Sequence, residues 1–113
     1  MIQTPHESPP RTGGPSPWGR IQTVSPLGTS AAVIVTTASH GGAWVPQAEL
    51  HRIPDRWREY GARWAHGYGE QWYEEDSAIA APLCYLPGAG TPKQAAQALE
   101  ELERIAACEG ATR

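Results

Sequence analysis

Two short stretches of the chain hold the side chains best suited to chemistry. The first is Ser39-His40-Gly41-Gly42, in which His40 could act as a general base or metal ligand and Ser39 as a nucleophile. The two glycines could also let a backbone N–H point at an oxyanion or a phosphate. However, these residue types are common in turns, and the strand–turn–helix context of a nucleophile elbow is missing. We therefore predict a structural turn in which His40 hydrogen-bonds the backbone, with a reaction site as the alternative.

The second stretch is the acid cluster Glu74-Glu75-Asp76, whose carboxylates could act as general acids or bases or hold a hard cation. Successive side chains of a helix point about 100° apart, so the three acids cannot all face one metal ion. The HxxxH and HExxH spacings of metal sites are also absent, so we expect no metal and no other cofactor. We predict that the acids form the first turn of a helix, where negative charge matches the helix dipole.

Aromatic residues are the most distinctive part of the composition, with five Trp, four Tyr and no Phe. All but Trp18 fall between Trp44 and Tyr85, in the same region as the acid cluster. Trp and Tyr combine apolar area with a polar tip, and together with Arg they are enriched at binding hot spots. We therefore predict a binding surface in this region. Its predicted residues are Trp44, Tyr68, Glu70, Trp72, Tyr73, Glu74, Glu75, Asp76, Arg56 and Arg63.

The charge pattern favours a protein partner. Nine basic and twelve acidic residues give a formal net charge of −3, which argues against general nucleic-acid binding. Residues 52–63 carry a local excess of arginine, whereas residues 70–76 carry four acids and no base. Such charge separation suits a partner with the complementary pattern. Direct nucleic-acid binding is the weaker alternative, and it would use Arg52, Arg56, Arg58 and Arg63.

The two cysteines, Cys84 and Cys108, match no zinc-site spacing and lie among Ala and Leu, so we predict buried free thiols. The chain has no signal-peptide core and no long apolar run. We therefore expect a cytoplasmic protein that does not contact a membrane.

The chain is predicted to divide into a flexible arm and one domain. Residues 1–17 contain five prolines and almost no apolar side chains, so they cannot bury enough surface to offset the entropy of ordering. Residues 18–113 are within the size range of a single domain. We predict an α+β fold in which a small antiparallel sheet, beginning with an N-terminal hairpin, packs against about three helices.

The hairpin strands are predicted at residues 18–24 and 30–38, joined by a turn at 25–28. A third strand is expected near 43–45 or 83–86, unless an open sheet edge pairs in a homodimer. An amphipathic helix is predicted over 54–66 from the apolar stripe of Ile53, Trp57, Tyr60 and Trp64.

The second helix should follow the acid cluster and stop or kink at Pro82, because proline lacks the N–H that a helix interior needs. The last helix should begin at Thr91, which forms a capping box with Gln94.

Three motifs occur together in a fixed order. They are Ser-Pro-Trp-Gly at 16–19, Thr-Ala-Ser-His-Gly-Gly at 37–42 and Trp-Tyr-Glu-Glu-Asp at 72–76. In this the chain resembles a family of small uncharacterised domains of unknown function from bacterial plasmids, prophages and phages, over residues 16–86. The Ala-rich stretch 78–81 and Pro82 depart from the bulkier apolar continuation expected there. The resemblance implies no known activity, cofactor or catalytic residue, but it does imply a mobile-element setting.

Small proteins of mobile elements are often inhibitors or adaptors, including anti-CRISPR and anti-restriction proteins. The expected function is thus a non-enzymatic interaction protein that binds and occludes a bacterial defence complex. In this hypothesis the acids of residues 70–76 compete for a basic nucleic-acid channel on the partner. The alternative from another class is a small hydrolase or metal-assisted enzyme that uses His40 with one acid of the 74–76 cluster.

Overall fold

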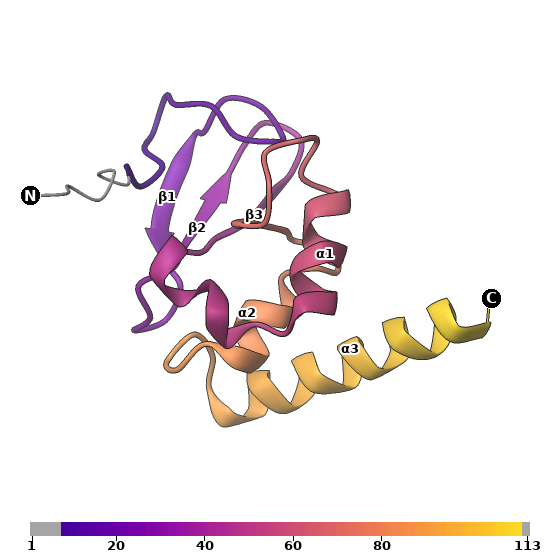
Figure 1. Ribbon diagram of the computed structural model, residues 1–113. Coiled ribbons are helices and arrows are strands. Elements are labelled where there is room, and N and C mark those ends of the chain that lie inside the picture. Colours follow the sequence, from indigo (N-terminus) through magenta and orange to yellow (C-terminus); the bar gives the residue numbers. More distant parts are fainter. Residues whose placement is uncertain (1–7, 112–113) are drawn as a thin grey trace, which may run out of the picture.

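The computed structural model describes residues 8–111 and contains a four-stranded antiparallel sheet flanked by helices (Figure 1). The strands pair in sequence order, and they are β1 (Thr23–Pro26), β2 (Val33–Thr36), β3 (Gly41–Trp44) and β4 (Trp72–Glu74). The helical elements are the 3₁₀ helix η1 (Gln47–Arg52) and the helices α1 (Asp55–Arg63), α2 (Ala80–Tyr85) and α3 (Pro92–Ala111). The predicted α+β fold, with an N-terminal antiparallel hairpin, is therefore confirmed.

The hairpin is shifted along the chain relative to its prediction. Strand β1 begins at Thr23 and continues through Pro26, which was predicted to lie in the turn. A proline is tolerated here because β1 lies at the edge of the sheet, where a missing N–H breaks no ladder bond. The turn follows instead at 27–32, where the Leu27 N–H donates to the Ala32 carbonyl over 3.0 Å, an ordinary hydrogen-bond distance.

The rest of the sheet was only partly predicted. The third strand lies at 41–44, close to the first predicted position, whereas residues 83–85 are helical, so the second position is wrong. The fourth strand, at 72–74, was not predicted. Trp72 pairs with Trp44, and the Glu75 N–H donates to the Gly41 carbonyl over 3.0 Å. Pairing with β3 therefore overrides the local preference of an acidic stretch for a helix start.

The prediction for the second helix was wrong for the same reason. The acid cluster ends β4 and enters a turn, and α2 begins only at Ala80. Pro82 then lies in the first turn of α2, where a backbone N–H has no partner within the helix. Pro82 therefore neither stops nor kinks the helix, and its carbonyl accepts a hydrogen bond of 3.0 Å from the Leu86 N–H.

Helix α1 starts and ends inside its predicted range. It begins after Pro54 and ends at Arg63, and the apolar stripe is buried at Ile53, Trp57 and Tyr60. Trp64 lies beyond the helix end and is 49% exposed, so the stripe is one residue shorter than predicted.

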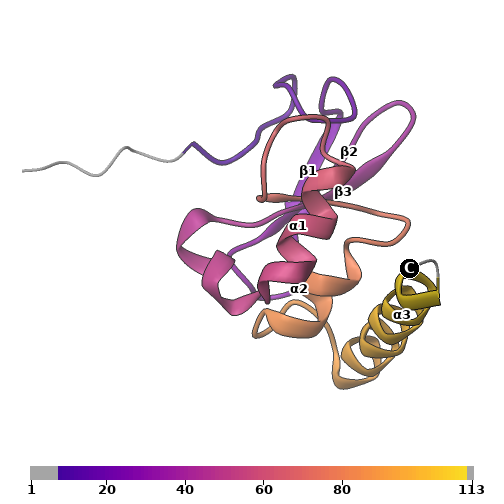
Figure 2. The same ribbon diagram turned by 45° about the vertical axis from the view of Figure 1, so that its right-hand side comes forward.

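Helix α3 has the predicted capping box. The Thr91 N–H donates to Gln94 Oε1 over 2.8 Å, and the Gln94 N–H donates to Thr91 Oγ1 over 3.1 Å. The helix runs past α2 and away from the sheet in both views (Figures 1 and 2). Its buried residues are Ala98, Leu102 and Ile105, which belong to the same apolar cluster as α2. Of the two cysteines, Cys84 is half-buried and Cys108 on α3 is exposed, so the prediction of buried thiols is wrong for Cys108.

The sheet is apolar on both faces. Ile34, Ala43 and Tyr73 point to the face that packs against the helices. Val35, Trp44 and Trp72 belong to a second cluster on the opposite face, which we call the tryptophan face. Because a strand alternates its side chains between faces, the adjacent residues Trp72 and Tyr73 contribute to different clusters.

Residues 13–21 cover the tryptophan face. The Gly13 N–H donates to the Ile21 carbonyl over 2.8 Å, and the Ile21 N–H donates to the Gly14 carbonyl over 2.9 Å. Ile21 is buried in the second cluster and Ser16 is also buried. The division of the chain after residue 17 stays a prediction, and residues 1–7 of the predicted arm lie outside the described residues.

Gly61 in α1 gives a test of the packing between sheet and helices. A Cβ at this position would lie 2.9 Å from Cδ2 and 3.0 Å from Cε2 of the Tyr73 ring. An exposed helical Gly→Ala change stabilises a protein by about 1 kcal/mol, but overpacking costs about 1–3 kcal/mol. We expect Gly61→Ala to lower the free energy of unfolding by about 1–2 kcal/mol in urea denaturation. The loss should disappear when Gly61→Ala is introduced into a Tyr73→Ala background, and an equal loss in both backgrounds would contradict the proposed contact.

Candidate functional site: an aromatic cavity and an acidic turn

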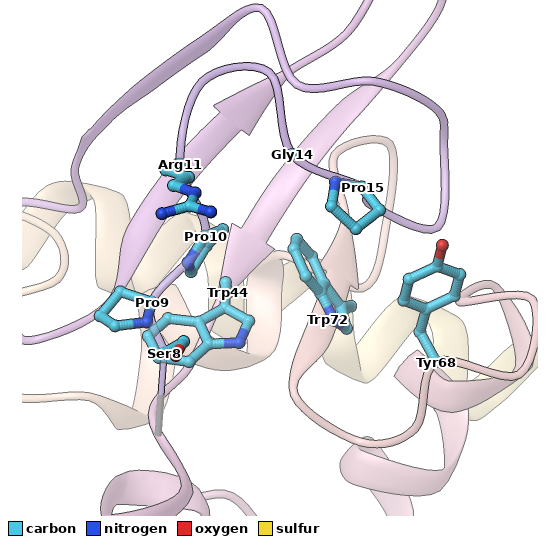
Figure 3. A pocket seen from close by; sticks show the side chains of 9 residues that line it. All are labelled: Ser8, Pro9, Pro10, Arg11, Gly14, Pro15, Trp44, Tyr68 and Trp72. Carbon is cyan, nitrogen blue, oxygen red and sulfur yellow. The ribbon is translucent and has the colours of Figure 1, made fainter. Parts of the chain in front are cut away.

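A cavity of about 410 Å³ opens on the tryptophan face (Figure 3). Trp44 and Trp72 come from neighbouring positions of β3 and β4, and Tyr68 comes from the loop that precedes β4. The other wall is formed by the N-terminal segment. The lining residues are Ser8, Pro9, Pro10, Arg11, Gly14, Pro15, Trp44, Tyr68 and Trp72. The structure thus brings together three of the predicted aromatic residues with a proline-rich segment that was not predicted to join them.

The rings contact one another edge to face. The centroid of Trp72 lies 5.8 Å from that of Trp18 and 6.2 Å from that of Tyr68, with interplanar angles of 85° and 87°. Trp18 is fixed further by its indole N–H, which donates to the Trp64 carbonyl over 3.1 Å. Trp44 and Trp72 are only 5% and 8% exposed, whereas Tyr68 is 47% exposed. Of the three rings, Tyr68 therefore offers the most surface for contact.

Gly41 and Gly42 make room for this packing. They were predicted to lie in the turn, but they are the first two residues of β3, and neither has a positive φ. A Cβ on Gly42 would lie 2.5 Å from a carbon of the Trp18 ring, and one on Gly41 would lie 2.9 Å from Glu75 Oε2. The glycine pair therefore permits the close approach of an indole and a carboxylate.

The turn between β2 and β3 is held by Thr37, a residue that sequence reasoning missed. Its backbone N–H and its hydroxyl both donate to the His40 carbonyl over 2.8 Å, and the His40 N–H lies 3.1 Å from Thr37 Oγ1. The prediction had the His40 side chain bonding the backbone. The available signal was a threonine three residues before the turn's last residue, a common source of side-chain bonds in turns. The side chains of Ser39 and His40 are both exposed.

The acid cluster lies at the same end of the sheet as His40. Glu74 pairs with Gly42 in the ladder, and its carboxylate accepts a hydrogen bond from the Asp76 N–H. Partial burial raises the pKa of Glu74, as do the negative charges of Asp76 and Glu75, whereas the Asp76 N–H and His40 lower it. Glu70, Glu75 and Asp76 are exposed. Within residues 8–111, no three His, Cys, Asp or Glu side chains are grouped as a metal ion would require.

Tyr73 lies apart from the other predicted binding residues. It is on the helix-facing side of the sheet, is fully buried, and packs its ring on Gly61. Its hydroxyl is also buried and has no hydrogen-bond partner among residues 8–111. Burial raises the pKa of this phenol, Glu70 raises it further, and Arg58 lowers it. Tyr73 therefore belongs to the core in this structure and presents no surface to a partner.

The two predicted binding arginines connect helices. Arg63 Nη1 lies 2.6 Å from Glu109 Oε2, and Arg56 Nη2 lies 3.7 Å from Glu109 Oε1. Arg56 also lies over the Trp57 ring, with 4.7 Å between the guanidinium carbon and the ring centroid. These contacts join α1 to the far end of α3. In addition, Arg52 pairs with Glu49 at 3.3 Å and Arg58 pairs with Asp55.

The fold and the cavity define a small α+β domain whose sheet carries an aromatic cavity on one face. A family model described as Domain of unknown function (DUF7007) matches residues 11–109, and the chain belongs to this family. The prediction of an uncharacterised domain family is thus confirmed, and the match extends beyond residues 16–86 at both ends. Searches of curated proteins and of solved structures find no significant match. None of the helices among residues 8–111 has the length and apolar character needed to span a bilayer.

The buried hydroxyl of Tyr73 can be tested by its removal. Tyr73→Phe should leave the free energy of unfolding unchanged or raise it by about 1 kcal/mol, because a desolvated group without a partner is lost. The advantage should grow above pH 10, since the unfolded tyrosine ionises near 10.0 while the buried phenol stays protonated. The stability of the wild type should therefore fall faster with rising pH. Urea denaturation at pH 7 and pH 10.5 measures both effects, with the exposed Tyr68→Phe as control. A loss of stability in Tyr73→Phe at pH 7 would reveal a hydrogen bond to this group.

The surroundings of Glu74 predict a raised pKa that an NMR titration can measure. The Glu74 carboxyl should titrate above the ordinary range of glutamate in an NMR titration of its side-chain carbon. Asp76→Asn and Glu75→Gln should each lower this pKa by removing a like charge, whereas His40→Asn should raise it by removing a favourable one. An unchanged Glu74 pKa in all three variants would contradict the arrangement of charges described above.

Proposed function

We propose that this protein is a small non-enzymatic interaction protein that binds a protein partner through the tryptophan face and the acidic turn. The observation that carries the proposal is the half-exposed Tyr68 ring at a surface cavity, in a stretch of chain that also carries the exposed carboxylates of Glu70, Glu75 and Asp76. Glu70 follows two residues after Tyr68, and Glu74 projects from the same face of β4 as Trp72. An aromatic centre with a charged rim is the usual composition of a binding surface.

The finer form of the proposal is an inhibitor of a bacterial defence complex, encoded by a mobile element and acting in the cytoplasm as anti-CRISPR proteins do. The charges support this form. Within residues 8–111, Glu70, Glu75 and Asp76 form no ion pair, so their negative charge is available to a basic surface. Carboxylates in such a position can compete with phosphates for a nucleic-acid channel, and the protein would act by occluding it.

The alternative of direct nucleic-acid binding has less support. It required the positive charge of four arginines in residues 52–63. Each of them is paired with a carboxylate of Glu49, Asp55 or Glu109, which reduces the positive potential of this region.

The alternative of a small hydrolase is favoured by one observation, which is the electrostatic influence of His40 on Glu74. However, Ser39, His40 and Glu75 are exposed to solvent. General acid–base groups are more effective in a site that excludes water. The side chains of Ser39, His40 and Glu75 do not lie in such a site. Binding therefore explains the arrangement better than catalysis.

The role of the exposed carboxylates of Glu70, Glu75 and Asp76 can be tested with charge-matched variants. The protein should restore plaque formation by a phage on bacteria that carry an active CRISPR or restriction system. The triple variant Glu70→Gln/Glu75→Gln/Asp76→Asn should lose about tenfold or more of this effect, because charge complementarity sets association rates. The control Glu59→Gln/Glu100→Gln/Glu103→Gln removes the same charge from exposed acids elsewhere and should retain the effect.

A wild-type protein that protects phage from none of these systems would overturn the inhibitor form of the proposal. Equal losses in the two triple variants would overturn the assignment of the surface, since only net charge would then matter.

A further inference from the structure

We infer that the cavity on the tryptophan face is a receptor for a proline-rich segment of the partner in the polyproline II conformation. This inference rests on the proposed function and names the chemistry of the partner at the aromatic part of the surface. Residues 8–11 of the chain itself form one wall of the same cavity.

The first support is the kind of residue that already lies there. Pro9 and Pro10 line the cavity on the side of Trp44, and Pro15 lines it on the side of Trp72 (Figure 3). The sequence Ser8-Pro9-Pro10 is of the type that adopts polyproline II, since proline fixes φ near −65° and disfavours the α region in the residue before it. The chain itself therefore places proline rings and aromatic rings around one cavity.

The second support is the supply of hydrogen-bond donors. A polyproline II segment has no internal hydrogen bonds, so its carbonyl groups need donors from a receptor or from water. Neither the indole N–H of Trp44 or Trp72 nor the hydroxyl of Tyr68 has an acceptor among residues 8–111. These groups come from β3, β4 and the loop before β4, and all three residues line the cavity. Aromatic grooves with such donors are the usual receptors of proline-rich segments.

Other occupants fit less well. A nucleobase stacks on an open ring face, but Trp44 and Trp72 are only 5% and 8% exposed. An organic cation would suit three aromatic rings, but Arg11 lies in the lining and repels positive charge. A proline-rich segment carries no charge, and the ring most accessible to it is that of Tyr68. The volume of about 410 Å³ lies within the range of ligand sites.

The experiment is a titration of the full chain with a ten-residue polyproline peptide, followed by the ¹H–¹⁵N signals of the five tryptophan side chains. The signals of Trp44 and Trp72 should shift, while that of Trp57, which is buried in the other cluster, should stay in place. A ten-residue Gly-Ser peptide should shift none of them. Single-stranded oligothymidine serves as the nucleic-acid probe.

Two variants sharpen the titration. Tyr68→Ala should weaken binding about fivefold or more, because it removes the most accessible ring of the cavity. Trp64→Ala is the matched control, since this ring is equally exposed but does not line the cavity.

Absence of shifts at Trp44 and Trp72 in a folded protein, or equal shifts with the Gly-Ser peptide, would overturn the inference. Shifts with oligothymidine alone would also overturn it in favour of nucleic acid. The plaque assay tests the carboxylates of Glu70, Glu75 and Asp76 and does not depend on the polyproline peptide. A protein that inhibits a defence system but does not bind polyproline would therefore refute this inference and leave the proposed function standing.

Discussion

A four-stranded sheet with strands of three or four residues has to be covered on both faces, and most of the structure follows from this constraint. Short strands contribute few ladder hydrogen bonds, so their stability depends on the apolar side chains that project from each face. The helices cover one face through Tyr73 and Ala43. Within residues 8–111, no helical residue belongs to the cluster on the other face, which the chain covers with Ile21 and Trp18 instead. The pairing of Trp44 with Trp72 is the centre of that second cluster.

The use of an irregular segment as the second cover has a functional consequence. A helix would have sealed the tryptophan face, whereas residues 8–15 follow its edge and leave a cavity between themselves and the rings. The same tryptophan side chains therefore stabilise the sheet and line the candidate site. Gly42 illustrates this double role, because its missing side chain lets Trp18 approach the sheet and so completes the packing behind Trp72.

The charges divide in a comparable way. The arginines of residues 52–63 pair with carboxylates on η1, α1 and α3, and Glu109 alone receives two of them. The positive charge of these arginines is thus balanced by carboxylates within the domain. The acids around β4 are oriented differently, because Glu74 is turned toward the Asp76 N–H while Glu75 and Asp76 face solvent. Within residues 8–111, Glu70, Glu75 and Asp76 form no ion pair, so the charge left available around β4 is negative.

The sequence by itself determined those features that depend on neighbouring residues. The β-branched run of β2, the capping box of α3 and the apolar stripe of α1 were all readable, since each is set by local conformational preferences and helical spacing. The aromatic residues Trp44, Tyr68 and Trp72 were also recognised as candidates from composition. Tertiary structure decided the rest. Strand β4 forms because β3 needs a partner, and this pairing sends Tyr73 into the core while Trp72 joins the cavity. Likewise, the prolines of residues 9–15 line one cavity with those rings although the segments are far apart in the chain, which no local pattern encodes.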